Sequence, residues 1–126
     1  MSLSVDHSTI TAHFDLPQGI HLSSPNQTYH LCMQADGNLV LYQGHVWRSD
    51  TAVWSSGTFN RGVGPFRLSM QSDGNLVIYD GRNTPTWTSN TQHRGFGPHR
   101  LVVQNDRNVV IYDAGNHPTW ATNTNV

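Results

Sequence analysis

The 126-residue sequence has little charge, one cysteine and no long apolar run, and each shortage excludes a class of protein. Charged residues make up 12% of the chain and the formal net charge is −1, so it lacks the basic surface that binds nucleic acid or anionic membranes. No apolar stretch approaches the roughly 20 residues that span a bilayer. We therefore expect no nucleic-acid partner and no membrane insertion.

The single cysteine, Cys32, excludes an intrachain disulfide. Two roles remain for it, a bridge between two chains or a buried small apolar residue, and we favour the second. At the N-terminus, residues 1–7 contain neither a positively charged region nor an apolar stretch, so no signal peptide is visible. We expect either release to the extracellular space by a non-classical route or a cytoplasmic protein.

The main feature of the sequence is a nine-residue segment that occurs three times. It occupies Gln34–Tyr42, Gln71–Tyr79 and Gln104–Tyr112, at intervals of 37 and 33 residues, and every copy reads Gln-x-Asp-x-Asn-x-Val-x-Tyr. Short runs of this kind at a fixed period indicate a repeat architecture. We call the three parts of the chain that carry these segments the first, second and third units.

Two further segments keep pace with this repeat. The pattern Trp-x-x-x-Thr begins at Trp54, Trp87 and Trp120, and Arg-Gly-x-Gly-Pro-x-Arg-Leu occurs at 61–68 and 94–101. We therefore interpret 1–126 as a single domain with internal repeats near 30–58, 67–91 and 100–124.

Each unit is predicted to contain a β-hairpin. In the second unit, two short apolar runs at 68–70 and 76–79 flank an Asp-Gly pair, which is a strong hairpin signal. Arg107 stands where the other units have glycine, and this favours a turn type open to most residues over one that needs positive φ. A further strand carrying the repeated tryptophan completes a sheet of three or four strands. The sequence thus predicts an all-β protein.

Strand alternation assigns the two faces of each hairpin. In the second unit Asn75, Val77 and Tyr79 share one side, whereas Leu76 and Ile78 share the other. The Leu/Ile side is the predicted core face, and the three repeated tryptophans are predicted to meet where three sheets pack around a common axis. The outer face then repeats Gln, Asp, Asn, Val and Tyr three times.

These outer-face residues suit a sugar, because a sugar hydroxyl both donates and accepts hydrogen bonds. Aspartate is a charged acceptor, Asn and Gln carry donors and acceptors, Tyr has a hydroxyl on a rigid ring, and Val offers an apolar contact. The candidate binding residues are Gln34, Asp36, Asn38, Val40 and Tyr42 in the first unit, Gln71, Asp73, Asn75, Val77 and Tyr79 in the second, and Gln104, Asp106, Asn108, Val110 and Tyr112 in the third.

The threefold pattern resembles the mannose-binding signature of the monocot, snowdrop-type (bulb) lectins, over about residues 20–126. The resemblance implies a β-prism II fold, in which three four-stranded antiparallel sheets surround a pseudo-threefold axis. It also implies that the Asp and Asn of each copy bind the 2-hydroxyl of mannose, Gln the 3-hydroxyl and Tyr the 4-hydroxyl, while Val touches ring carbons. The implied partners are mannose and mannose-containing glycans, without a metal or other cofactor.

Plant members of this family usually have a signal peptide and an internal disulfide, neither of which is visible in this sequence. In this respect the chain is similar to a branch from fish skin and mucus. By analogy with that branch, we expect a role in defence recognition of microbes and an extracellular or mucus location. The exchanged C-terminal strand of plant dimers suggests a homodimer.

Three other interpretations compete with this one. A structural or protein-binding module could retain the fold with silent sugar sites. A glycosidase is disfavoured because each motif supplies one aspartate and not a facing pair of carboxylates, so we expect no enzyme and no catalytic residue. The eight histidines show no metal-ligand spacing, so no metal site is expected.

Trp47, in the longer loop of the first unit, has two candidate roles. It could stack on a second sugar or cover an edge of the fold, and from the sequence we favour the second.

Overall fold

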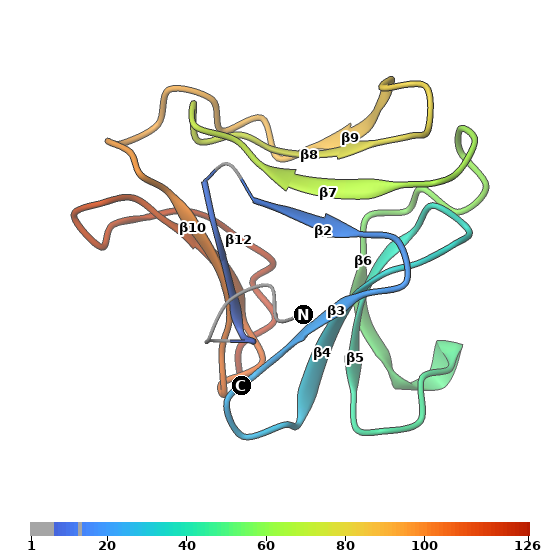
Figure 1. Ribbon diagram of the computed structural model, residues 1–126. Coiled ribbons are helices and arrows are strands. Elements are labelled where there is room, and N and C mark those ends of the chain that lie inside the picture. Colours follow the sequence, from blue (N-terminus) through green and yellow to red (C-terminus); the bar gives the residue numbers. More distant parts are fainter. Residues whose placement is uncertain (1–6, 13) are drawn as a thin grey trace.

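The computed structural model of the protein describes residues 7–12 and 14–126. The signal-peptide prediction rests mainly on residues 1–6, which lie outside this range, as does His13. The described residues form three four-stranded antiparallel sheets, arranged as the sides of a prism (Figure 1). The helical content of the described residues is one 3-10 turn, η1 (Ser49–Thr51), and none of their helices has the length and apolarity to cross a membrane. The predicted all-β, β-prism II fold is confirmed.

Each sheet contains the strands of one unit plus one strand from the N-terminal segment. The sheet of the first unit consists of β3 (His21–Ser23), β4 (Tyr29–Met33), β5 (Leu39–Gln43) and β6 (Ala52–Ser55). The sheet of the second unit consists of β2 (Asp15–Pro17), β7 (Arg67–Met70), β8 (Leu76–Tyr79) and β9 (Pro85–Thr88). The sheet of the third unit consists of β1 (Thr9–Thr11), β10 (Arg100–Val103), β11 (Val109–Tyr112) and β12 (Pro118–Ala121).

The N-terminal segment thus visits all three sheets before the first hairpin begins (Figure 1). β1 pairs with β10, β2 with β7 and β3 with β4, all antiparallel. At the other end of the chain, β12 pairs with β11 of the same chain. Each sheet therefore has four strands, and the fourth comes from a part of the sequence that carries no repeat.

The core lies on the predicted face of each sheet. Leu76 and Ile78 are 1% and 0% exposed and belong to one buried cluster that includes their counterparts from the other two units. Packed against it are Trp54, Trp87 and Trp120, whose rings meet edge to face with centroids 5.7 to 5.9 Å apart. The three tryptophans come together as predicted.

The turn prediction based on Arg107 is wrong. Arg107 has φ of 75°, and the equivalent Gly37 and Gly74 have φ of 87° and 90°, so all three turns use the left-handed region. A Cβ at Gly37 would lie 2.8 Å from the Phe66 ring, and one at Gly74 would lie 2.8 Å from the His99 ring. Both rings come from the Gly-Pro segment, which occurs twice in the sequence, so the third turn has no such neighbour from that segment. Arg107 is accommodated there, and its Nε donates to the carbonyl of Thr124 at 2.9 Å.

Candidate binding sites on the three hairpins

In each unit the hairpin gathers the five predicted residues on its outer face. In the second unit Gln71 follows β7, Asp73 lies in the turn, Asn75 precedes β8, and Val77 and Tyr79 alternate along β8. The register is the same in every unit, since the Val and Tyr of each copy pair with equivalent residues of the preceding strand. We call these three sets the first, second and third sites.

The aspartate of each site is fixed by the turn that it occupies. Asp73 Oδ1 accepts a hydrogen bond from the backbone N–H of Asn75 at 2.9 Å, and the equivalent distances are 2.9 Å in the first site and 3.0 Å in the third. The turn is closed by the N–H of Gly74, which donates to the carbonyl of Gln71 at 3.1 Å. One carboxylate oxygen is thus engaged by the backbone, which leaves Oδ2 to face a ligand.

The asparagine is held by residues that the analysis of the outer face did not include. Asn75 Oδ1 accepts from Ser89 Oγ at 3.2 Å and from the N–H of Thr91 at 3.2 Å. Because the amide oxygen is held in this way, the Nδ2 group becomes the donor available to a ligand. The same arrangement involves Ser56 and Thr58 in the first unit and Thr122 and Thr124 in the third.

These supporting residues belong to the Trp-x-x-x-Thr segment, whose even spacing was the signal that could have identified them. Thr91, 1% exposed, also donates from Oγ1 to the carbonyl of Gly74 at 2.8 Å. The segment therefore connects the central tryptophan to the turn that carries the aspartate.

Glutamine and tyrosine of each site form a pair. Gln71 Nε2 donates to Tyr79 Oη, and the same bond joins Gln34 to Tyr42 and Gln104 to Tyr112. With the glutamine nitrogen engaged, its Oε1 can accept from a ligand, and the tyrosine can donate its proton to one. Each site thus presents two acceptors, Asp Oδ2 and Gln Oε1, beside two donors, Asn Nδ2 and Tyr Oη–H.

The valine of each site is more deeply buried than expected for a residue predicted to contact the ligand. Val40, Val77 and Val110 are on the outer face, as alternation predicts, but they are only 3% to 4% exposed. The valine forms the floor of the site, and it offers a ligand a small apolar area.

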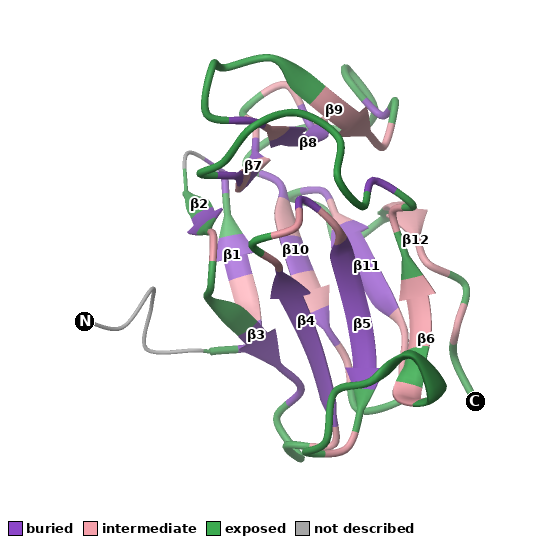
Figure 2. Cartoon of the chain, turned by 90° about the vertical axis from the view of Figure 1, so that its right-hand side faces the viewer, coloured by how far each residue is buried: buried purple, intermediate pink, exposed green. Residues whose placement is uncertain are grey.

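The surroundings of the tyrosine distinguish the first site from the other two. The guanidinium of Arg67 lies 4.5 Å from the Tyr79 ring centre, and that of Arg100 lies 4.9 Å from the Tyr112 ring centre. In the first site His30 stands opposite the tyrosine, and the Trp47 ring stacks on Tyr42 at 5.9 Å. His30 and Tyr42 lie on β4 and β5, which are the buried middle strands of the sheet of the first unit (Figure 2).

Three histidines border the first site. His30 is 3% exposed, and its ring lies 5.7 Å from that of His21 and 5.4 Å from that of His45. Burial lowers the pKa of His30, and repulsion from the two neighbouring rings lowers it further. Its Nδ1 is bonded to Ser23 Oγ at 2.7 Å, whereas its Nε2 has no hydrogen-bond partner among the described residues. Within the described part of the chain, no group of three or more His, Cys, Asp or Glu residues could hold a metal ion.

Several solved structures with this architecture are lectins. A monocot mannose-binding lectin from Gastrodia elata, described as monomeric, is 44% identical, with a TM-score of 0.82 over 94% of this chain and 99% of that one. The lectin of Polygonatum cyrtonema, solved with a monomannoside, is 38% identical, with a TM-score of 0.73 over 93% and 96% of the two chains. Snowdrop (Galanthus nivalis) agglutinin, solved with methyl α-D-mannoside, is 36% identical, with a TM-score of 0.73 over 94% and 98%. No protein-family model and no curated protein sequence matches the chain.

A β-prism with three repeated polar hairpin faces defines the class as a lectin-type binding protein. The chain belongs to the family of monocot mannose-binding lectins, the bulb-type lectins.

Proposed function

We propose that the protein binds mannose and mannose-containing glycans at the three hairpin sites, without a metal ion. The observation that carries the proposal is the same set of two donors and two acceptors, held by the same supporting bonds, in all three units. An ionised aspartate beside an amide donor can both accept from and donate to a pair of neighbouring sugar hydroxyls. The solved relatives that hold mannosides support the choice of sugar.

The apolar floor of each site is small, since its valine is only 3% to 4% exposed, so a single mannose should bind weakly. A dissociation constant in the millimolar range corresponds to about 4 kcal/mol. Three sites on the three sides of one prism can engage a surface that carries clustered mannose, and avidity then raises the affinity by a factor of about 10² to 10⁴. Recognition of microbial surfaces outside the cell, with defence as its purpose, is the role that this multivalency suits.

Affinity chromatography tests the sugar and the metal independence together. The folded protein should be retained on mannose-agarose in EDTA, and it should be eluted by free mannose but not by galactose. Flow-through of folded protein, or elution by both sugars, would contradict the proposal. The first of these results would favour a protein-binding module with silent sites.

Site-directed variants test the assignment of residues. Asp73→Asn keeps an oxygen that can accept from the N–H of Asn75 but removes the charge, so the fold should persist while the second site is lost. A hydrogen bond to a charged group contributes about 1.5 to 3 kcal/mol, which predicts affinity at that site weaker by a factor of about 10 to 150. Calorimetric titration with methyl mannoside should give a stoichiometry reduced by one site, and an unchanged stoichiometry would refute the assignment.

The homodimer suggested by the resemblance stays a prediction. β12 lies on the sheet of its own chain, and the Gastrodia lectin is described as monomeric, so exchange of this strand is not required to complete a sheet. Sedimentation equilibrium distinguishes the two states. A dimer mass would mean that the chains associate through some other surface or exchange β12 on association.

A further inference from the structure

The first site differs from the others in a loop that only its unit has. The four extra residues of the first unit lie between Tyr42 and Trp54, and this loop carries Trp47. The Trp47 indole stacks on Tyr42 with an interplanar angle of 12°, and its Nε1 donates to the carbonyl of Gly44 at 2.9 Å. The ring of His21, on β3, lies edge-on to it at 4.9 Å. The loop therefore places an aromatic side chain, held by these contacts, beside a predicted mannose site.

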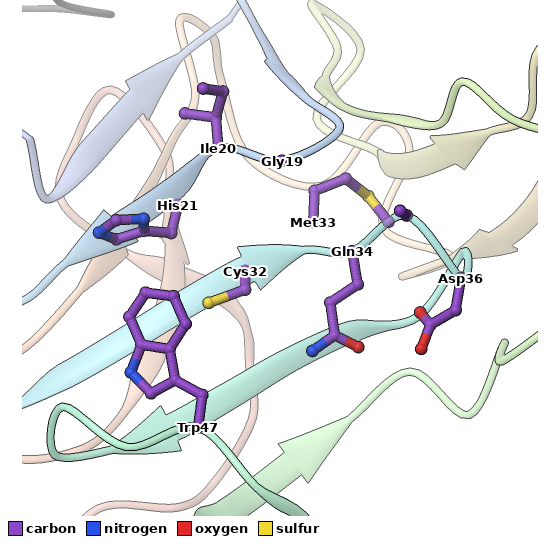
Figure 3. Close-up of a pocket in the computed structure, with 9 residues that line it drawn as sticks. Gly19, Ile20, His21, Cys32, Met33, Gln34, Asp36 and Trp47 are labelled. Carbon is purple, nitrogen blue, oxygen red and sulfur yellow. The ribbon is translucent and has the colours of Figure 1, made fainter.

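A cavity of about 420 Å³ joins this aromatic surface to two of the predicted sugar-binding residues, Gln34 and Asp36. Gln34 and Asp36 line one part of it, and Ile20, His21 and Trp47 line another, with Cys32 between them (Figure 3). The polar groups of the site and an apolar wall thus border one continuous space.

The second site has a cavity of different character. It measures about 310 Å³, and the positions of His21 and Cys32 are taken there by Asp15 and Ser69. Asp15 forms an ion pair with Arg67 at 3.3 Å. The second site is therefore bordered by charge where the first is bordered by aromatic and apolar side chains.

The apolar wall of the first site is accessible to a ligand. Trp47 is 40% exposed and Ile20 is 42% exposed, although both line the cavity. Placing a ring against these side chains removes apolar surface from water, and a flat face suits a tryptophan ring. The C–H face of a pyranose offers such a surface, and a mannose held on Gln34 and Asp36 would bring the next sugar of a chain toward it.

We propose that the first site binds a longer ligand than the other two, with a terminal mannose on the hairpin and a second sugar ring against Trp47, His21 and Ile20. The assignment rests on the proposed mannose binding and adds a subsite to one of its three sites. It takes up the other of the two roles considered for Trp47 from the sequence, because the residue lines a cavity that reaches the site.

The test isolates one site at a time. In one protein, Asp73→Asn and Asp106→Asn leave the first site, and in the other, Asp36→Asn and Asp106→Asn leave the second. Each protein is titrated with methyl α-mannoside and with an α-linked mannobiose, and the measured quantity is the ratio of the two dissociation constants. At the first site mannobiose should bind about tenfold more tightly than methyl α-mannoside, a difference equivalent to ~1.4 kcal/mol. At the second site the two ligands should bind with about equal affinity. Equal ratios at the two sites would overturn the subsite.

Variants of the loop test whether the indole of Trp47 causes the higher affinity for mannobiose at the first site. In the protein that retains the first site, Trp47→Ala should bring the ratio to the value of the second site, and Trp47→Phe should keep part of the gain. Phe96→Ala is the matched control, because Phe96 is also an exposed aromatic, at 83%, and does not line the cavity. A ratio that Trp47→Ala leaves unchanged would refute the assignment.

Two further outcomes separate the proposals from each other. A p-nitrophenyl mannoside tests for an aromatic group in the same place, and a gain with this ligand but none with mannobiose would overturn the second-sugar assignment. Absence of methyl mannoside binding at all three sites of the unmodified protein would refute the proposed function itself. Binding of methyl mannoside with equal ratios would refute the subsite alone.

Discussion

The positive φ of Gly74 allows a quantitative prediction of how much stability is lost when it is replaced by alanine. Alanine at this position has to adopt φ near 90° and has to place its Cβ 2.8 Å from His99 Nε2. The His99 ring cannot move easily, because it is 2% exposed and its Nε2 is 2.6 Å from the carbonyl of Arg94. Gly44 provides the matched control, since its φ is 86° and its Cβ would meet no described atom within 4 Å.

The two substitutions therefore separate backbone strain from crowding. A left-handed conformation costs a residue other than glycine about 1 to 2 kcal/mol, and the stiffer unfolded chain returns about 0.4 to 1 kcal/mol. Gly44→Ala should thus destabilise the protein by about 1 kcal/mol. Crowding in a packed region adds about 1 to 3 kcal/mol, so Gly74→Ala should cost about 2 to 4 kcal/mol.

Urea denaturation measures both values, as a lowered midpoint at an unchanged m-value. The double variant Gly74→Ala with His99→Ala gives a further check. Because the ring is absent, Gly74→Ala should destabilise the His99→Ala protein by less than it destabilises the parent protein. If Gly74→Ala costs no more than Gly44→Ala, the Gly-Pro segment does not dictate glycine in the turn. The explanation for Arg107 would then fail as well.

Two other predictions concern pH and the thiol. Because burial lowers the pKa of His30 below 6.5, the native state binds fewer protons than the unfolded chain, so the free energy of unfolding should fall as the pH drops below about 6.5. Backbone N–H groups lower the pKa of Asp80 and Asp113, which should cause a second loss of stability at more acid pH as these carboxylates protonate; a flat stability profile between pH 7.5 and 3 would contradict both statements. Burial raises the pKa of Cys32 to about 12, so native protein at pH 8 should react slowly with a thiol reagent, although the thiol borders the cavity of the first site. Protein in urea should react rapidly and once per chain, and equally rapid labelling of the native protein would contradict the prediction.

The hairpins and their faces could be predicted because each depends on residues close in sequence. An Asp-Gly pair between apolar runs specifies the turn at Asp73, and alternation alone places Leu76 on the core side. The gathering of the tryptophans followed from one aromatic residue at the same place in every repeat. The donor and acceptor types on the outer face were equally visible, since they follow from residue identity and strand parity.

The features that the sequence did not reveal depend on contacts between residues that are distant in the sequence. The conformation of Arg107 could not be inferred, because the glycines at the equivalent positions are required by Phe66 and His99 of the following segment. The role of Ser89 was missed for a similar reason, since a hydroxyl near the end of one strand supports an amide at the start of another. The cavity beside Trp47 depends on where a loop of unusual length folds back, and no local pattern specifies that.

The path of the N-terminal segment has a consequence for how the protein folds. Ile10 pairs with Leu101, Leu16 with Leu68 and Leu22 with Leu31, so the first strands close one short loop, one of about 50 residues and one of about 90. Closing long loops costs entropy before the pairing is formed, and folds rich in such pairings reach the native state slowly. The sheet of the third unit is therefore incomplete until the two ends of the chain meet. Although the sequence is a triplication, its three parts are expected to assemble as one cooperative unit, and no single repeat carries all the strands of its own sheet.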